Sequence, residues 1–242
     1  MTVEKGEMFY EGKAKKLYKT SDQNIYIQEF KDSLTAFNAL KRGSFQGKGR
    51  INREITTIIF KHLAAKGIPT HFVELQGERD MVIRALKIFP LEIVVRNIVT
   101  GSLMKRLGLE EGRLLPRPIV EFYFKNDLLG DPIVTDDHIE IMELATPDQV
   151  EALRVLGLKV NAELKTFFKE IGITLVDFKI EAGLDAQGKI CLGDEITPDS
   201  CRLWDEKTKE KLDKDRFRQD LGKVEESYRL VCDKIKRKWG KA

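Results

Sequence analysis

The chain has 242 residues, of which 42% are hydrophobic and 33% are charged. This composition is typical of a globular protein with one large domain or two small lobes. The formal net charge is only +3 and the basic residues are dispersed among acidic ones, which argues against a nucleic-acid-binding protein and suits a small anionic substrate.

No apolar run is long enough to span a bilayer, and residues 1–7 lack the hydrophobic region of a signal peptide. The three cysteines show no CxxC spacing, so neither a disulfide framework nor a zinc site is indicated. We therefore expect a cytoplasmic protein with reduced thiols and no membrane association.

The first predicted elements are two strands within residues 9–18, joined by a turn at Gly12, and a third strand over 24–30. Gly12 allows the backbone to approach a ligand closely, and Lys13 and Lys15 follow it. The pattern fits a hairpin that covers phosphates, although the Walker loop motif is absent. Lysines that only keep an edge hairpin soluble are the alternative.

Residues 31–38 have the composition of a loop, and we expect the basic, glycine-rich stretch 43–49 to form a flexible connector. A helix is predicted over 50–66, with an apolar stripe along one side and a stop at Gly67. His62 lies on that stripe, so we expect it to be packed in the interior rather than to bind a ligand.

Three further strands and a short helix are expected over residues 70–75, 81–88, 90–97 and 103–107. Before this helix, a Thr-Gly-Ser sequence offers the Ser102 hydroxyl and free backbone N–H groups. With Arg96 nearby, these groups would form a site for a phosphate or carboxylate. An ordinary helix cap by Ser102 explains the same sequence.

A strand over 117–124 leads into an acidic loop over 125–132. This loop suits a sugar hydroxyl, a metal ion or simply a turn rich in Asp and Asn. A long helix is expected over 150–171, with Thr146 as its N-cap and Pro147 in its first turn. Its apolar residues keep helical spacing, so we expect it to be a packing helix.

The segment 175–181, Leu-Val-Asp-Phe-Lys-Ile-Glu, has the period-two alternation of a strand. Side chains at alternate positions share a face, so Asp177, Lys179 and Glu181 would lie together on one side. The opposite side would be apolar. We expect this segment to be the organising element of the fold.

A turn near residues 186–187 would fold a second strand, 189–193, back along the first and bring Asp194 near Glu181. Two carboxylates from adjacent strands suit Mg²⁺, which keeps water and substrate phosphates as its other ligands. The lysine between them would lower their pKa values and reach a phosphate. A solvated face with cross-strand ion pairs is the alternative.

The segment after this hairpin carries Arg202, a second side chain suited to an oxyanion. Residues 207–218 are so highly charged that we expect a solvated or loop-like stretch. An amphipathic helix over 220–239 closes the chain, and its basic end favours a helix C-terminus without indicating nucleic acid.

Five stretches, in this order, resemble the phosphoribosylaminoimidazole-succinocarboxamide synthase (SAICAR synthetase) family over nearly the whole chain. They are residues 10–15, 90–102, 176–181, 194–205 and 212–218. The Arg-x3-Thr-Gly-Ser and Asp-x-Lys-x-Glu motifs are its most specific parts.

The resemblance implies an α+β, two-lobed SAICAR synthase-like fold with the active site in the cleft. We expect residues 1–90 to form a β-rich N-terminal ATP-binding lobe. Residues 91–242 would form the larger α/β substrate- and metal-binding lobe.

The resemblance also implies an ATP-dependent ligase of de novo purine biosynthesis. It would join L-aspartate to the carboxylate of 5-amino-1-(5-phospho-D-ribosyl)imidazole-4-carboxylate (CAIR), giving SAICAR, ADP and phosphate through an acyl phosphate. ATP would be a co-substrate, Mg²⁺ the cofactor, and a homodimer is possible. The alternatives are a small-molecule kinase with a similar Mg-ATP site and a catalytically silent nucleotide-binding module.

The roles that the resemblance implies for single residues fall into three sets. The metal ligands would be Glu181 and Asp194. The substrate-binding residues, among which Asp177, Lys179 and Arg202 would also be catalytic, would be Arg96, Ser102, Asp177, Lys179 and Arg202. The ATP-binding residues would be Gly12, Lys13, Ala14, Lys15, Lys125 and Asp131.

Three positions depart from the family pattern. Ala182 stands where phenylalanine is usual, Arg84-Ala85 replaces a pair of lysines, and Ala39 stands where glycine is usual. None of these departures removes a charged group that the chemistry requires.

Overall fold

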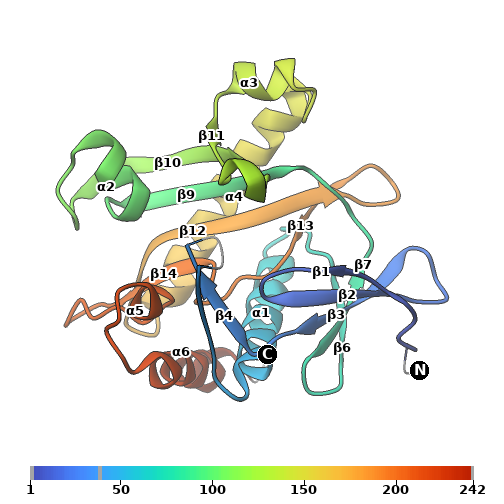
Figure 1. Cartoon of the computed structure of the whole chain (residues 1–242), viewed down its shortest axis with the longest axis horizontal. Helices are drawn as coiled ribbons and strands as arrows, with labels where there is room; N and C mark the ends of the chain where they lie inside the picture. The colour runs from blue at the N-terminus through green and yellow to red at the C-terminus, as the bar shows by residue number, and fades with distance from the viewer. Residues whose placement is uncertain (1–2, 38–39, 241–242) are drawn as a thin grey trace.

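The computed structural model describes residues 3–37 and 40–240 (Figure 1), so the departure at Ala39 lies outside the described residues. A first, five-stranded sheet comes from the N-terminal part of the chain. Its strands are β1 (Met8–Glu11), β2 (Lys15–Lys19), β3 (Ile25–Phe30), β6 (Phe72–Gln76) and β7 (Asp80–Arg84). Their order is β1-β2-β3-β7-β6, and every pair is antiparallel.

Between β3 and β6, the chain forms a two-stranded ribbon, β4 (Ser33–Ala36) with β5 (Lys41–Ser44), and then helix α1 (Lys48–Ala65). The prediction of a loop is therefore wrong at 33–36, and that of a connector is wrong at 43–44 and 48–49, whereas residues 45–47 do connect β5 with α1 and residue 38 lies outside the described residues. The reason is tertiary: the Asp32 carboxylate accepts a 2.8 Å hydrogen bond from the N–H of Gly49 at the start of α1.

A second sheet carries most of the remaining strands. They are β8 (Lys87–Ile88), β9 (Leu91–Ile98), β10 (Leu114–Phe124), β11 (Ile133–Val134), β12 (Ile173–Leu184), β13 (Ile190–Gly193) and β14 (Cys201–Asp205). The main order is β11-β10-β9-β12-β13, and β12 also pairs with β14 and β8. Segment 175–181 of β12 pairs with β9 and β14 and, at Glu181, with β13, as expected of the element that organises the fold.

The other helical elements follow or cover this sheet. They are α2 (Gly101–Leu107), the 3₁₀ turn η1 (Asp127–Leu129), α3 (Asp136–Ile141), α4 (Pro147–Lys169), α5 (Asp215–Arg218) and α6 (Val224–Trp239). The predicted cap of α4 is confirmed, because the Thr146 hydroxyl accepts from the N–H of Gln149. Within the described residues, no helix is long and apolar enough to span a membrane.

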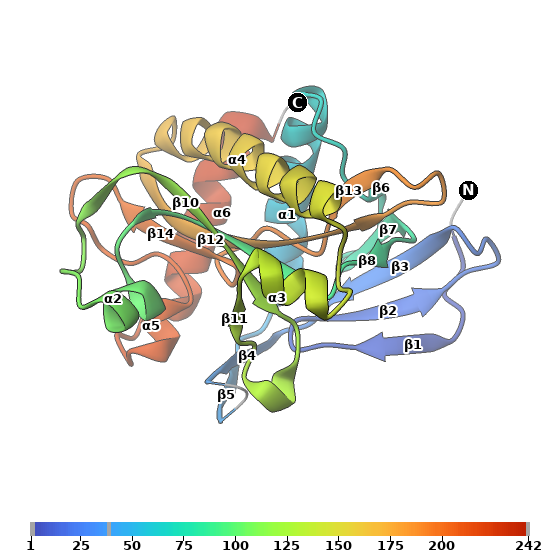
Figure 2. The same ribbon diagram turned by 90° about the horizontal axis from the view of Figure 1, so that it is seen from above.

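Helix α4 covers one face of the second sheet, and α1 packs against β3, β6 and α6 (Figure 2). Gly157 allows α4 to lie close to the sheet, because a Cβ atom there would stand 3.1 Å from a methyl of Ile93. His62 of α1 packs against the rings of Phe167 and Trp239, at centroid distances of 5.1 and 5.0 Å, as predicted.

One hydrophobic core runs through both halves of the molecule. It joins Phe30 and Met81 of the first sheet, Phe60 of α1, Phe178 of the second sheet and Tyr228 of α6. The fold is mixed α/β with two lobes, as expected from the resemblance. The division of the chain at residue 90 stays a prediction.

In the highly charged stretch 207–218, residues 207–210 are exposed as predicted, but residues 211–218 are buried or half-buried. Asp213, Asp215 and Arg216 are all buried. The Asp213 carboxylate accepts hydrogen bonds from the N–H groups of Leu203 and Asp215, at 2.8 and 2.7 Å. These charges are buried because backbone groups and ion pairs satisfy them, which composition does not reveal.

Candidate functional site

The polar face of the second sheet is the floor of a cleft. Asp177 lies opposite Arg96 in the pairing of β12 with β9, and Lys179 lies opposite Val94. The predicted common face is thus confirmed for Asp177 and Lys179. A cavity of about 330 Å³ lies over it. Its lining residues are Lys13, Glu92, Val94, Arg96, Ser102, Tyr123, Asp131, Asp177, Phe178, Lys179, Asp199, Ser200, Cys201, Arg202, Lys214 and Arg218.

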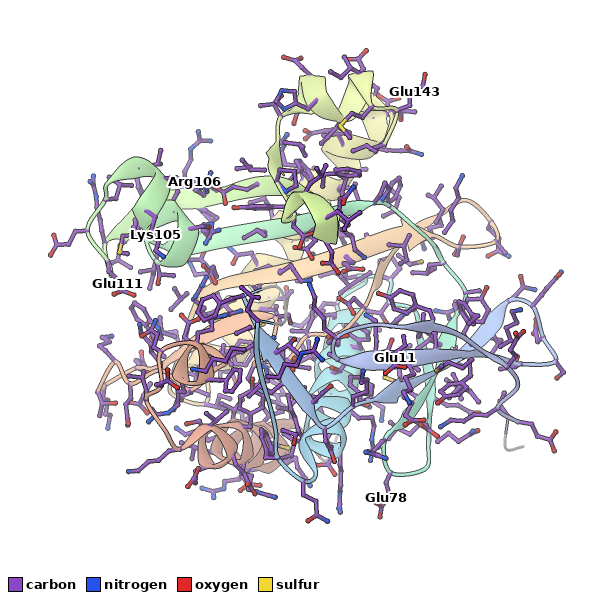
Figure 3. All side chains as sticks on the ribbon, viewed as in Figure 1. Glu11, Glu78, Lys105, Arg106, Glu111 and Glu143 are labelled. Atoms are coloured by element: carbon purple, nitrogen blue, oxygen red, sulfur yellow. The ribbon has the colours of Figure 1, made fainter. Side chains whose placement is uncertain are left out.

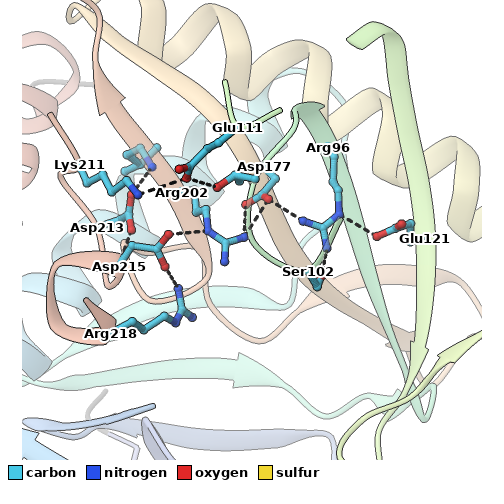
Figure 4. A network of polar contacts seen from close by, with 12 residues as sticks. Arg96, Ser102, Glu111, Glu121, Asp177, Arg202, Lys211, Asp213, Asp215 and Arg218 are labelled. Atoms are coloured by element: carbon cyan, nitrogen blue, oxygen red, sulfur yellow. Dashed lines mark hydrogen bonds and ion pairs between the residues drawn. The ribbon is translucent and has the colours of Figure 1, made fainter. Parts of the chain in front are cut away.

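Asp177 links two arginines that are far apart in the sequence (Figure 4). Its Oδ2 accepts hydrogen bonds from Arg96 Nη1 at 2.8 Å and from Arg202 Nη1 at 2.9 Å. Antiparallel pairing of β12 with β9 and with β14 brings the three residues together. The sequence alone did not indicate that Arg96 and Arg202 meet.

The remaining donors of Arg96 are also occupied. Its Nε donates to Glu121 at 2.7 Å, and its Nη2 donates to the hydroxyls of Ser102 at 2.9 Å and Tyr123 at 3.2 Å. Ser102 does not cap α2, whose N-cap is Thr100 with no side-chain bond. The interpretation of Ser102 as an ordinary cap is therefore wrong, and its hydroxyl lines the cleft.

Arg202 keeps one side of its guanidinium available. Its Nε donates to Asp215 at 2.8 Å and its Nη1 to Asp177, whereas Nη2 has no hydrogen-bond partner among residues 3–37 and 40–240. Nη2 lies against Gly101, where a Cβ atom would stand only 2.6 Å away. A ligand oxyanion has a free donor here.

A second charged group surrounds Glu181 farther along β12. Lys125 Nζ donates to its carboxylate at 2.5 Å, and Lys179 Nζ lies 3.7 Å away while donating to Glu92 at 2.6 Å. Burial opposes the charge of Glu181, yet Lys179, Lys15 and Lys125 hold its pKa below the usual value. Burial likewise opposes the charge of Lys179, but Glu181 and Glu92 raise its pKa above the ordinary range.

Asp194 follows the predicted hairpin. Glu181 lies opposite Gly193, so Asp194 is its diagonal neighbour, as expected. Lys15 of the first sheet forms ion pairs with Asp194 and, at 3.1 Å, with Glu195. Cross-strand ion pairs are thus present, but they are buried rather than solvated, since Glu181 and Asp194 are each only 7% exposed.

The carboxylate oxygens of Glu181 and Asp194 are suitable ligands for Mg²⁺ in a site that a bound nucleotide completes. Within the described residues, no group of three or more His, Cys, Asp or Glu side chains is placed to hold a metal ion. Two carboxylates suffice for Mg²⁺ when nucleotide phosphates and water complete its six ligands. Lys15 pairs with Asp194 and Lys125 with Glu181.

The remaining residues expected at ATP lie around this group. Gly12 closes the β1–β2 turn by donating from its N–H to the Lys15 carbonyl at 2.9 Å, and Ala14 accepts from the Lys31 N–H at 2.8 Å. Lys13 pairs with Asp127 of η1 at 2.7 Å. Asp131 lines the cleft and accepts from the N–H of Asn126, so its loop is also an Asx-rich turn.

The sequence reasoning missed several polar residues of the cleft. Glu92 and Tyr123, which line the cavity, and Glu121, which accepts from Arg96 behind it, have no local pattern that sets them apart. Asp199, Lys214 and Arg218 fall within stretches of family resemblance but received no role. Asp199 accepts from Lys48, Asn52 and Tyr228, and although burial opposes its charge, Lys48 and Lys214 hold its pKa below the usual range.

Two of the family departures are visible in the structure. Ala182 is buried on β12, and its carbonyl accepts from the N–H of Phe89 at 2.9 Å. Arg84 Nη1 donates to the Thr70 carbonyl at 2.8 Å. The backbone pairing next to Glu181 is therefore complete with alanine at position 182.

Comparison with known proteins agrees with this geometry. The family model for SAICAR synthetase matches residues 8–235. A phosphoribosylaminoimidazole-succinocarboxamide synthase of Bacillus subtilis is 52% identical over 235 residues, covering 97% of this chain and 98% of the relative. One of Desulfitobacterium hafniense is 53% identical over 234 residues, covering 97% of this chain and 98% of the relative.

Solved structures give the same result. The synthase of Ehrlichia chaffeensis superposes with a TM-score of 0.92 at 44% identity, covering 95% of this chain and 98% of that one. A SAICAR synthetase in complex with ADP superposes with a TM-score of 0.91 at 47% identity, covering 93% of this chain and 96% of that one. The chain therefore belongs to the SAICAR synthetase family, ATP-dependent ligases of purine biosynthesis that form a carbon–nitrogen bond.

Proposed function

We propose that this enzyme joins L-aspartate to the carboxylate of CAIR at the expense of ATP. The observation that carries the proposal is that two groups of charged and polar side chains lie along one strand, β12. Ser102 and Arg202 offer donors to an anionic substrate beside the positive charge of Arg96, and Glu181 and Asp194 lie among lysines farther along β12 and at the end of β13. Family membership supports the same reaction.

The chemistry begins with activation of a poor acyl donor. A substrate carboxylate oxygen attacks the γ-phosphorus of ATP, the bond to ADP breaks, and an acyl phosphate forms. The neutral amine of L-aspartate then attacks the acyl carbon, inorganic phosphate leaves, and the nitrogen loses a proton to complete the amide. No enzyme nucleophile takes part, so the side chains act by positioning and by electrostatic stabilisation.

Each part of the cleft has a place in this scheme. Glu181 and Asp194 would hold Mg²⁺, which when bound offsets the repulsion between phosphates and carboxylate. Lys13, Lys15 and Lys125 would contact the ATP phosphates, beside the backbone of Gly12 and Ala14 and near Asp131. These sites lie at the end of the cleft where the first sheet meets β12 and β13.

The ribonucleotide would lie over Asp177. Ser102 and the free Nη2 of Arg202 would bind its phosphate or carboxylate, and Asp177 would keep Arg96 and Arg202 in place. Lys179, whose raised pKa keeps it protonated, would stabilise negative charge that develops at the reacting carboxylate.

The decisive experiment measures ADP release with ATP, Mg²⁺ and CAIR, with and without L-aspartate. Aspartate-dependent release together with the succinocarboxamide product is the expected result. Release that ignores aspartate would indicate a small-molecule kinase, and ATP binding without turnover would indicate a silent nucleotide-binding module. Either outcome would contradict the proposal.

We further propose that the enzyme acts as a homodimer, as the family resemblance implies. Sedimentation equilibrium of the full chain tests this directly. A mass equal to one chain at all protein concentrations would contradict it.

A further inference from the structure

Two cations at one end of the cleft have no role in the reaction as described so far. Lys214 and Arg218 lie one helical turn apart at the short helix α5, and both line the cavity. Their side chains are 15% and 29% exposed. They are therefore largely desolvated yet open to a ligand.

The carboxylate nearest to Lys214 is already occupied. Asp199 Oδ1 lies 3.8 Å from Lys214 Nζ, but this carboxylate also binds Lys48, which is only 1% exposed, and accepts from Asn52 and Tyr228. Burial lowers the pKa of Lys214, and Arg218, Lys48 and Lys179 lower it further, whereas Asp199 opposes this effect. Positive charge is thus in surplus around Lys214.

Arg218 likewise shares its carboxylate partner, Asp215, with a second cation. This carboxylate accepts from Arg218 Nη1 and also from Arg202 Nε (Figure 4). Neighbouring Asp213 forms no ion pair with these cations and accepts from backbone N–H groups, and burial together with Asp215 raises its pKa to about 7, so it is only partly charged at neutral pH. Two carboxylates, Asp199 and Asp215, therefore serve two cations each at this end of the cleft.

We propose that Lys214 and Arg218 form the subsite for the two carboxylates of L-aspartate. The inference rests on the proposed function, in which the ribonucleotide occupies Arg96, Ser102 and Arg202. An α-amino dicarboxylate supplies the two negative charges that this end of the cleft lacks. The surplus of cations also disfavours the ammonium form of the bound amino acid, which leaves the neutral amine that attack on the acyl phosphate requires.

The test compares KM values for the separate substrates in Lys214→Met and Arg218→Met. We expect KM for aspartate to rise at least tenfold in each variant, while KM for CAIR and for ATP stays within twofold of the wild type. Hydroxylamine replaces aspartate as a nucleophile without carboxylates, so the rate of hydroxamate formation should be unchanged. Exposed Lys207→Met and Arg237→Met are the matched controls.

Conservative variants keep the test decisive if a methionine variant fails to fold. Lys214→Arg and Arg218→Lys retain the charge, so KM for aspartate should rise less than in the methionine variants. A raised KM for CAIR with an unchanged KM for aspartate would overturn the proposal and place the ribonucleotide phosphate on these cations. Unchanged KM values for both substrates would also overturn it.

The measurement with hydroxylamine distinguishes a failure of this subsite assignment from a failure of the proposed reaction. If wild-type enzyme releases ADP with hydroxylamine but never depends on aspartate, the proposed function fails. If the wild type depends on aspartate and the variants bind it normally, only the assignment of Lys214 and Arg218 fails.

Discussion

Gly101 is the residue on which the position of the Arg202 guanidinium most directly depends. It has a left-handed φ of +58°, and a Cβ atom would stand 2.6 Å from Arg202 Nη2. We expect Gly101→Ala to raise KM for CAIR at least tenfold, because the guanidinium must move away from its place beside Asp177. Steady-state kinetics with CAIR varied gives the measurement.

Gly108→Ala is the control for backbone strain in this prediction. Gly108 has a similar φ of +64° but no atom within 4 Å of an added Cβ. Both variants therefore lose about 1–2 kcal/mol to the left-handed backbone, and only Gly101→Ala should change KM. Equal KM values in the two variants would show that the contact with Arg202 is unimportant.

Glu121 positions Arg96 without lining the cavity. Its carboxylate accepts from Arg96 Nε at 2.7 Å, from Arg106 of α2 (Figure 3) and from the Tyr123 hydroxyl at 3.0 Å. Burial opposes its charge, but the two arginines hold its pKa below the usual value. A charged hydrogen bond of this kind contributes about 1.5–3 kcal/mol.

We expect Glu121→Gln to raise KM for CAIR by about tenfold, which corresponds to about 1.4 kcal/mol. KM for ATP should not change, because Glu121 lies at the Arg96 end of the cleft. Glu110→Gln, at an exposed position in the loop before β10, serves as the control. An equal effect on both KM values would argue for general loss of structure instead of a role in placing Arg96.

For single residues, the sequence predicts the positions of side chains that depend only on local spacing. Asp177 and Lys179 share a face because strands alternate, and their pairing with β9 confirms it. Glu121 was not predicted, since its carboxylate matters only through an arginine on the neighbouring strand. The meeting of Arg96 with Arg202 likewise depends on strand order, which spacing along one strand does not contain.

Among the elements, α4 is joined to β9 by a buried pair of amides. Asn97 Nδ2 donates to Asn161 Oδ1 at 2.8 Å, and Asn161 Nδ2 donates back to Asn97 Oδ1 at 3.0 Å. Asn161→Leu should lower the free energy of unfolding by about 1–3 kcal/mol, because it leaves the buried Oδ1 of Asn97 without its hydrogen-bond donor. Urea unfolding monitored by circular dichroism measures this change.

The double variant Asn97→Leu/Asn161→Leu tests the cause. With both amides replaced by apolar groups of similar shape, the loss should be smaller than in Asn161→Leu alone. If the double variant loses as much stability as the two single variants together, the amide pair is not the source of the stability.

Element prediction succeeded where signals were local. Thr146, Pro147 and Gln149 placed the start of α4 correctly, because a cap depends on residues within one turn. Residues 33–36, 43–44, 48–49 and 211–218 were mispredicted as irregular or solvated. Charged groups in or near these stretches form ion pairs with residues far away in the sequence, such as Lys41 with Asp220 and Lys48 with Asp199. Composition does not reveal such contacts.

Across the whole molecule, Asp199 connects segments that are far apart in the chain. It binds Lys48 and Asn52 at the start of α1, Tyr228 of α6 and Lys214 before α5. The overall fold was predictable from motifs in a fixed order, but this junction was not. It exists only because the N-terminal helix α1 packs against the C-terminal helix α6.

Asp199→Asn should lower the free energy of unfolding by about 3–5 kcal/mol at pH 7, because it leaves the buried ammonium of Lys48 without its counter-charge. In the wild type the pKa of Asp199 is depressed by Lys48 and Lys214 although burial opposes its charge. A depressed carboxyl pKa contributes stability above its unfolded value of about 4 and loses it as pH falls toward the folded value. The difference between wild type and variant should therefore be constant from pH 8 to about 5 and shrink below about 4.

Urea titrations at pH 3–8 measure this difference, with exposed Asp233→Asn as the control that should match the wild type throughout. A difference that stays constant down to pH 3 would mean that Asp199 is not held ionised by the lysines. A difference near zero at pH 7 would mean that Lys48 finds another partner. The expected pH dependence would instead identify this one carboxylate as the electrostatic link between the first helix, the last helix and the cation-rich end of the cleft.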